Sequence, residues 1–178
     1  ATAAQNSITT ATGLVTIGAA ATATTVAGIP FYSNDTSSIY TTDVSGTDST
    51  ASGNSAYGYQ ALDAITTGDV NTAIGVGALG ANTTGAGSTA VGRNALAANN
   101  ADENTAVGAT ALAANTTGTG NIAVGNKAAE TNTTGARNIA IGYGAYDASD
   151  TENDNIAIGY EAMTTNTAGG IKNIALGN

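Results

Sequence analysis

The sequence has no histidine, cysteine or tryptophan, and it has only four basic residues. Without histidine and cysteine, the chain lacks the usual general base, thiol chemistry and soft-metal ligands. The basic residues are Arg93, Lys127, Arg137 and Lys172, and the formal net charge is −9. Nucleic-acid binding needs clustered Lys and Arg to neutralise phosphates, so it is disfavoured. We therefore expect no enzyme, catalytic residue, cofactor, metal site or nucleic-acid partner.

Long hydrophobic runs are also missing. No stretch approaches the roughly eighteen continuous apolar residues that are typical of a membrane-spanning helix. Residues 14 to 29 are the most apolar part of the first quarter, but they are interrupted by threonines and have no basic flank. We expect neither a membrane span nor a signal peptide or anchor in this segment.

The sequence does contain a repeat of about seventeen residues, marked by a glycine at intervals of 17, 17, 16, 17, 17, 17 and 18. These glycines are Gly58, Gly75, Gly92, Gly108, Gly125, Gly142, Gly159 and Gly177. A repeat of this length is typical of architectures in which each unit covers the open face of its neighbour. We therefore expect a stacked fold for this part of the chain.

Each unit begins four residues before its glycine, and positions are counted from that first residue. The first residues are Asn54, Asn71, Ser88, Asn104, Asn121, Asn138, Asn155 and Asn173. Residues 71–87 give the clearest copy. Position three is alanine in every unit, and position four is aliphatic in every unit but the first, which has Tyr57. A second pair, such as Ala78 and Leu79, occupies positions eight and nine.

The two apolar segments of each unit are too short to be stable helices, so we expect two short strands per coil. Stacked in register, the units would form an all-β, parallel β-solenoid with about 4.8 Å between coils. The first, third and fifth side chains of the first strand would share one face. Asparagines at position one and at position twelve (Asn82, Asn99, Asn115, Asn132 and Asn166) would form ladders along the stack.

The apolar content of one unit is small, since only two of its seventeen residues are large and apolar. Burying one such side chain contributes roughly 1.5–3 kcal/mol, whereas ordering each residue costs on the order of 1.5 kcal/mol. One solution places the alanines inside and presents part of the aliphatic set to another chain, and the reverse arrangement is the alternative. Either way, we expect a homo-oligomer.

Three short runs carry a resemblance to known families: residues 71–75, 104–108 and 138–142, which follow the pattern Asn-(Thr/Ile)-Ala-(Ile/Val)-Gly. They resemble the head repeats of YadA-type trimeric autotransporter adhesins. The longer pattern, with Ala-Leu and Asn-Thr-Thr-Gly, is similar to repeats of bacteriophage and cyanophage tail fibres. The resemblance covers residues 54–178 and implies a left-handed β-roll and a trimer. Because the units are longer than adhesin repeats, the tail-fibre branch is favoured.

Residues 1–53 follow a different pattern and form a separate predicted region. They are rich in Ala and Thr, contain the single proline, Pro30, and end in a stretch rich in Ser, Thr, Asp and Gly. We expect short strands followed by a linker. The segment would either attach the chain to another component or cap the first coil, and the sequence favours neither.

Two groups of residues outside the repeat core are candidates for binding. Tyr59, Tyr143 and Tyr160 follow the repeat glycine by one residue and could stack on the sugar rings of a host glycan or contact a host protein. An acidic group, Asp147, Asp150, Glu152, Asp154 and Glu161, could offer oxygen ligands to Ca²⁺. It lacks the glycine spacing of calcium loops, so a solvated turn is the preferred interpretation.

The Asn-x-Thr sequences at residues 34–36, 82–84, 115–117 and 132–134 match the glycosylation signal. Three of the four follow from the turn chemistry of the repeat, and we expect no modification there.

The preferred functional hypothesis is a structural segment of an extracellular fibre or spike, as in a virion tail fibre that supports attachment to a host cell. The alternative is a bacterial surface adhesin head or filament subunit that binds host or matrix ligands through repetition. An acyltransferase on a hexapeptide β-helix is disfavoured because the spacing of apolar residues differs and no histidine is present.

Overall fold

The computed structural model describes residues 24–26, 29–31, 39–40, 50–147, 151–164 and 169–177. Strands β1 (Thr24–Val26) and β2 (Ile29–Phe31) pair with each other in an antiparallel manner. All other strands belong to one nine-stranded sheet in which neighbours are parallel and follow chain order. The described part of the chain is therefore all-β.

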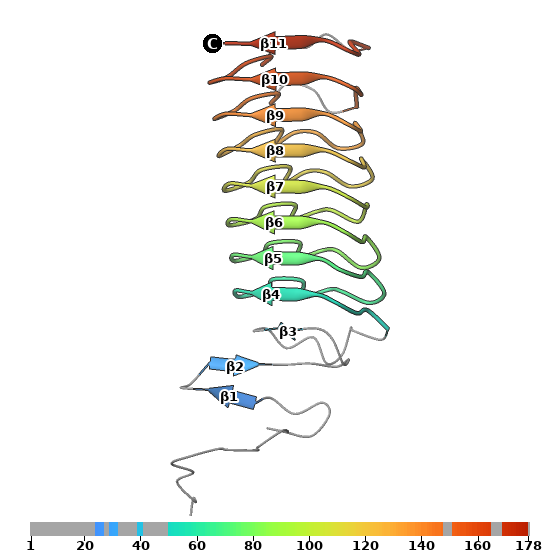
Figure 1. The fold of residues 1–178 in the computed structure, drawn as a ribbon, viewed down its shortest axis with the longest axis vertical. Helices are drawn as coiled ribbons and strands as arrows, with labels where there is room; N and C mark the ends of the chain where they lie inside the picture. Colours follow the sequence, from blue (N-terminus) through green and yellow to red (C-terminus); the bar gives the residue numbers. More distant parts are fainter. Residues whose placement is uncertain are drawn as a thin grey trace, which may run out of the picture.

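The sheet is a stack of rungs, one from each coil (Figure 1). It begins at β3 (Ile39–Tyr40), which pairs with the first repeat strand. The repeat strands are β4 (Ser55–Tyr57), β5 (Thr72–Ile74), β6 (Thr89–Val91), β7 (Thr105–Val107), β8 (Ile122–Val124), β9 (Ile139–Ile141), β10 (Ile156–Ile158) and β11 (Ile174–Leu176). Equivalent residues face each other, as in the pairing of Ala73 with Ala90. The predicted parallel β-solenoid with about seventeen residues per coil is confirmed.

The strands separate small side chains from large ones. The central alanine of each strand from β4 to β10 is buried, whereas the residues on either side of it point outward and are exposed or half-buried. Ala140, for example, has no exposed surface, while Ile141 beside it is 39% exposed. Of the two arrangements expected from the sequence, the structure has the one with alanines inside. Positions two and four together form the outer columns.

The second apolar segment is not a strand, and in this respect the prediction of two strands per coil is wrong. Ala78 and Leu79 are neighbours in sequence, yet both are fully buried, which an alternating strand would not allow. Leu79 has φ of 50°, in the left-handed region. This conformation turns both side chains inward. The coils remain linked there by single backbone bonds, such as Leu79 N–H to Ala95 O at 3.0 Å.

The repeat glycine lies where the chain leaves the strand and bends. Gly58 has φ of 136°, and a Cβ built on it would lie 2.6 Å from the carbonyl oxygen of Gly75 in the next coil. A side chain is therefore excluded both by the backbone conformation and by the neighbouring coil. The chain therefore bends at a residue that must be glycine.

Asparagines at position one tie three coils together from inside. Asn121 is buried; its N–H donates to Asn104 Oδ1 at 2.9 Å and its Nδ2 donates to Gly135 O at 2.8 Å. Its own Oδ1 accepts the N–H of Asn138 at 2.9 Å. The ladder thus joins side chains to backbone, which satisfies polar groups that the narrow interior shields from water.

The position-twelve asparagines form a second ladder, this one between amides. Asn115 Nδ2 donates to Asn99 Oδ1 at 2.7 Å, and Asn132 Nδ2 donates to Asn115 Oδ1 at 3.0 Å. Asn166 lies outside the described residues. The predicted position-one ladder is present, and the predicted position-twelve ladder is present from Asn99 to Asn132, whereas Asn82 bonds to Gly85 of its own coil.

Candidate functional site

Position six forms an exposed column along one side of the stack, directly after the repeat glycines. Its described members are Tyr59, Val76, Arg93, Ala109, Asn126, Tyr143 and Tyr160. Tyr143 and Tyr160 come from consecutive coils, and their rings stack with centroids 5.3 Å apart and planes 10° apart. Tyr59 belongs to the first unit and has Val76 as its neighbour in the next coil. The structure therefore joins two of the three candidate tyrosines and leaves the third apart.

All three candidate tyrosines are exposed, Tyr59 by 71%, Tyr143 by 44% and Tyr160 by 56%. The stacked rings cover each other's inner faces, so a ligand would meet their edges, hydroxyl groups and outer faces. A hydrogen bond from Tyr160 to the Glu161 carboxylate, together with the charge of Glu161, raises the pKa of the Tyr160 phenol. Tyr160 thus has a carboxylate close to its hydroxyl group.

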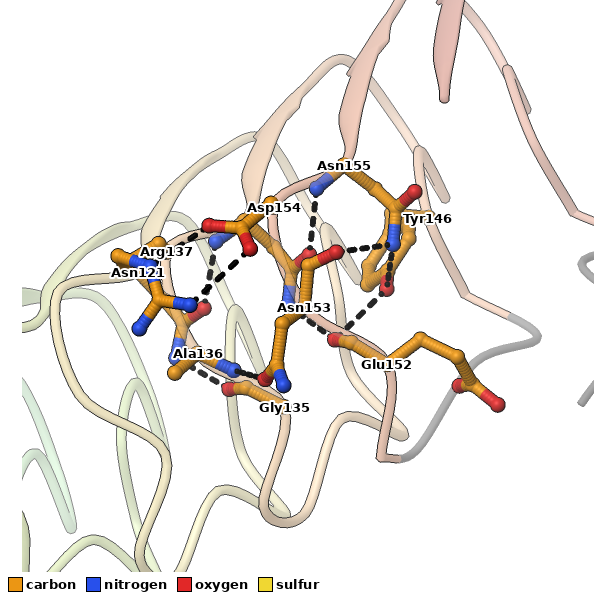
Figure 2. Close-up of polar contacts among 10 residues, drawn as sticks. Asn121, Gly135, Ala136, Arg137, Tyr146, Glu152, Asn153, Asp154 and Asn155 are labelled. Carbon is orange, nitrogen blue, oxygen red and sulfur yellow. Dashed lines mark hydrogen bonds and ion pairs between the residues drawn. The ribbon is translucent and has the colours of Figure 1, made fainter. Parts of the chain in front are cut away.

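Tyr146 (Figure 2) is a different kind of tyrosine, because it is fully buried, at the position that leucine holds in the first four units. Its hydroxyl donates to Glu152 O at 3.2 Å and accepts from Asn155 Nδ2 at 3.0 Å. In other units the position-twelve asparagine donates to the equivalent carbonyl, as Asn132 does to Gly135 at 3.0 Å. Tyr146 therefore fills the core, and its hydroxyl makes the bonds to the Glu152 carbonyl and to the next position-one asparagine, while the amide ladder itself ends at Asn132 Oδ1, which has no partner among the described residues. A sequence signal existed, since this unit has serine at position twelve.

Next to this network, Arg137 forms an ion pair with Asp154 of the following coil (Figure 2). The guanidinium Nε lies 2.6 Å from Asp154 Oδ1, and Nη2 lies 3.0 Å from Oδ2. The hydrogen bond from Arg137, supported by the charges of Arg137 and Lys172, lowers the pKa of Asp154. Each of these three residues directly precedes the first residue of the next unit, so charges of alternating sign follow one another along the stack.

The other acidic residues of the predicted group do not form a common site. Glu152 Oε1 accepts the N–H of Gly169 at 3.0 Å. Asp147 lies near Glu130, and its burial, followed by the charge of Glu130, raises its carboxyl pKa. Asp150 lies outside the described residues. Among those that are described, no three acidic side chains come together in a way that could hold a metal ion.

The glycosylation signals within the repeat are inaccessible. Asn82, Asn115 and Asn132 are fully buried in the interior of the stack. The fourth, at Asn34, lies outside the described residues. A folded chain therefore cannot offer the three buried asparagines to a glycosylating enzyme.

A hollow of about 580 Å³ opens beside β11, between residues 161–164 and 174–177. Glu161 is the one charged residue in its lining, and Met163 and Ala175 form part of its apolar wall. This arrangement offers no pair of groups for acid–base chemistry. In the parts of the chain that the structure covers, no helix has the length and apolar character needed to cross a bilayer.

No family model matches the sequence, and neither curated proteins nor solved structures yield a match. The functional argument therefore rests on the residues and their geometry.

Proposed function

We propose that this chain is a structural segment of an extracellular fibre or spike, most closely comparable to a virion tail fibre, that projects and supports an attachment end. The observation that carries the proposal is the pair of outer columns on an in-register stack. Chemistry-bearing groups are scarce in the described residues, and the polar side chains of the interior serve the ladders. The chain would act through its shape and stiffness.

The outer columns support self-association. Exposed apolar members recur from coil to coil: Tyr57, Ile74, Val107, Ile122, Val124, Ile141, Ile158, Ile174 and Leu176. They lie on one face because each belongs to position two or four. A continuous exposed apolar stripe of this kind favours contact with another protein surface. A homotrimer with left-handed coils, as the resemblance implies, is the assembly that we propose, with an end-to-end polymer as the alternative.

The inner ladders support a stiff role. Each coil is bonded to the next through the sheet, through the asparagine side chains and through the turn backbone. In such stacks each unit contacts only its neighbours, and curvature follows from the small rotation per unit. A segment built this way would be rigid and would hold its two ends at a fixed separation.

The mass of the chain in solution, measured by light scattering, tests this proposal. We expect three times the 17.1 kDa of one chain, with elongated particles in electron micrographs. A folded monomer would overturn the proposal, because the outer columns would then have no protein to cover them. A distribution of masses that grows with concentration would support the end-to-end filament.

The adhesin alternative is favoured by one observation, namely the exposed tyrosines on the position-six column. It predicts that the isolated protein binds host cells or matrix glycans directly. Binding that is lost in Tyr143→Phe/Tyr160→Phe, but kept in Tyr59→Phe, would support an adhesin head. A trimer without any such binding would support the passive fibre segment.

A further inference from the structure

The stacked pair Tyr143 and Tyr160 has a property that the fibre role does not use. Both rings are exposed, both belong to the same column, and their centroids lie 5.3 Å apart. Parallel, in-register coils hold equivalent side chains about 4.8 Å apart, so this proximity is imposed by the backbone. The chain has no cysteine, so no disulfide can join neighbouring coils.

We propose that Tyr143 and Tyr160 form an oxidative cross-linking site, at which a peroxidase using hydrogen peroxide joins the two rings as dityrosine. Each phenol loses one electron and one proton to become a phenoxyl radical. The radicals form a carbon–carbon bond between the positions next to the hydroxyl groups, and the two ring protons move to oxygen and restore both phenols. One hydrogen peroxide is reduced to two waters.

The arrangement favours coupling within one chain. Two radicals must meet before either is quenched, and the stack already holds the rings against each other. Tyr59 is the most exposed of the three tyrosines, but its neighbour in the next coil is Val76, so it has no partner of the same kind there. Exposure alone would therefore favour Tyr59, whereas proximity favours Tyr143 and Tyr160.

Glu161 gives the pair a proton acceptor. Glu161 directly follows Tyr160 in the chain, and its carboxylate, which raises the pKa of the Tyr160 phenol, can take the proton as the electron leaves. The oxidation does not require a phenolate, because the proton leaves together with the electron. It can therefore proceed although Glu161 raises the pKa of Tyr160. Glu161 acts here as a positioning residue for the oxidation of Tyr160. The product would tie the unit that begins at Asn138 to the unit that begins at Asn155.

The test treats the full chain with horseradish peroxidase and hydrogen peroxide and measures dityrosine fluorescence. Both tyrosines lie between Arg137 and Lys172, so one tryptic peptide, 138–172, contains them. We expect this peptide to lose two hydrogens while the chain keeps its monomer size on a denaturing gel. Tyr143→Phe and Tyr160→Phe should each abolish the intrachain product, and the matched variant Tyr59→Phe should leave it unchanged.

Two further variants separate proximity from general reactivity. Val76→Tyr places a tyrosine next to Tyr59 and should create a second intrachain cross-link, within the tryptic peptide 1–93. Glu161→Gln should slow formation of the Tyr143–Tyr160 product without changing the circular dichroism spectrum. Cross-links that form only between chains, or an intrachain product that persists in Tyr143→Phe, would overturn the proposal.

Discussion

Val70 occupies a backbone conformation that is costly for its side chain. The residue directly before the first residue of each unit has a positive φ, and three of these residues are glycines: Gly53, Gly87 and Gly120. Val70 has φ of 52° and is 63% exposed. A β-branched residue in the left-handed region is strained, and here little burial offsets the strain.

Val70→Gly should therefore stabilise the protein. Relief of the left-handed strain is worth about 1 kcal/mol, less the backbone entropy that glycine adds to the unfolded chain. We expect a higher midpoint of urea unfolding. Val76→Gly is the matched control, since Val76 is also exposed but has no positive φ, and it should not stabilise. Equal shifts in the two variants would contradict the strain argument.

The ion pair of Asp154 predicts a loss of stability in acid. Its folded-state pKa is lowered by Arg137, so the contribution is present above the unfolded value of about 3.9 and is lost as the pH falls through the folded value. Asp154→Asn should lower the unfolding midpoint at pH 7 and remove this part of the acid dependence. Glu103→Gln is the control, because the neighbours of Glu103 in the same column are Gly87 and Gly120, which have no charged side chain to pair with it. Unchanged acid dependence in Asp154→Asn would contradict the prediction.

Asp147 should change the pH dependence of stability in the opposite direction to Asp154. Burial and Glu130 raise its folded-state pKa, so the folded protein binds the extra proton between the unfolded and folded values. The free energy of unfolding therefore falls as the pH rises through this window. Asp147→Asn should stabilise the protein at pH 7 and flatten the fall. Asp63→Asn, at the same position but with Gly80 in the next coil, should do neither; a gain in both variants would count against the Glu130 contribution.

At the scale of elements, the strands could be predicted from the sequence and the second side of the coil could not. Ala73 between Thr72 and Ile74 has the alternation of a strand with one buried face, and the structure has that strand. Ala78 and Leu79 look equally apolar, but their inward direction depends on a left-handed leucine. Leucine gives no local signal for that conformation. The glycines at position seven were a weak indication that this side of the coil uses the left-handed region, since Gly77 and Gly144 also have a positive φ.

The asparagine ladder should be the element most sensitive to substitution. Asn121→Ala leaves the buried Asn138 N–H without its partner, which costs about 1–3 kcal/mol. It also removes one of the two side-chain hydrogen bonds that the Gly135 carbonyl accepts, and the bond from Asn132 remains. We expect a loss of about 2–4 kcal/mol in the free energy of unfolding, measured by urea denaturation. Asn126→Ala, exposed in the same coil, should change the stability little. A similar loss in both variants would mean that the ladder is not the cause.

At the scale of the whole molecule, part of the candidate site could be predicted from the sequence and part could not. That Tyr143 and Tyr160 are exposed followed from their place after the repeat glycine, and their stacking follows from equal positions in consecutive units. That Tyr146 takes over hydrogen bonds of a position-twelve asparagine could not be predicted, because it depends on how far the phenol reaches in the folded coil and not on residue spacing. Contact with a host ligand stays a prediction for all three exposed tyrosines.

The assembly prediction depends on the direction of Ile141. Its side chain points outward beside the buried Ala140, so Ile141→Asp should leave the coil folded and place an unpaired charge in the interface between chains. Burying such a charge is costly, and we expect dissociation constants at least about 100-fold higher, with a native circular dichroism spectrum. Light scattering should then give the mass of one chain. Thr134→Asp, exposed on the turn, should keep the oligomer. If Ile141→Asp retains the wild-type mass, the outer columns are not the contact surface.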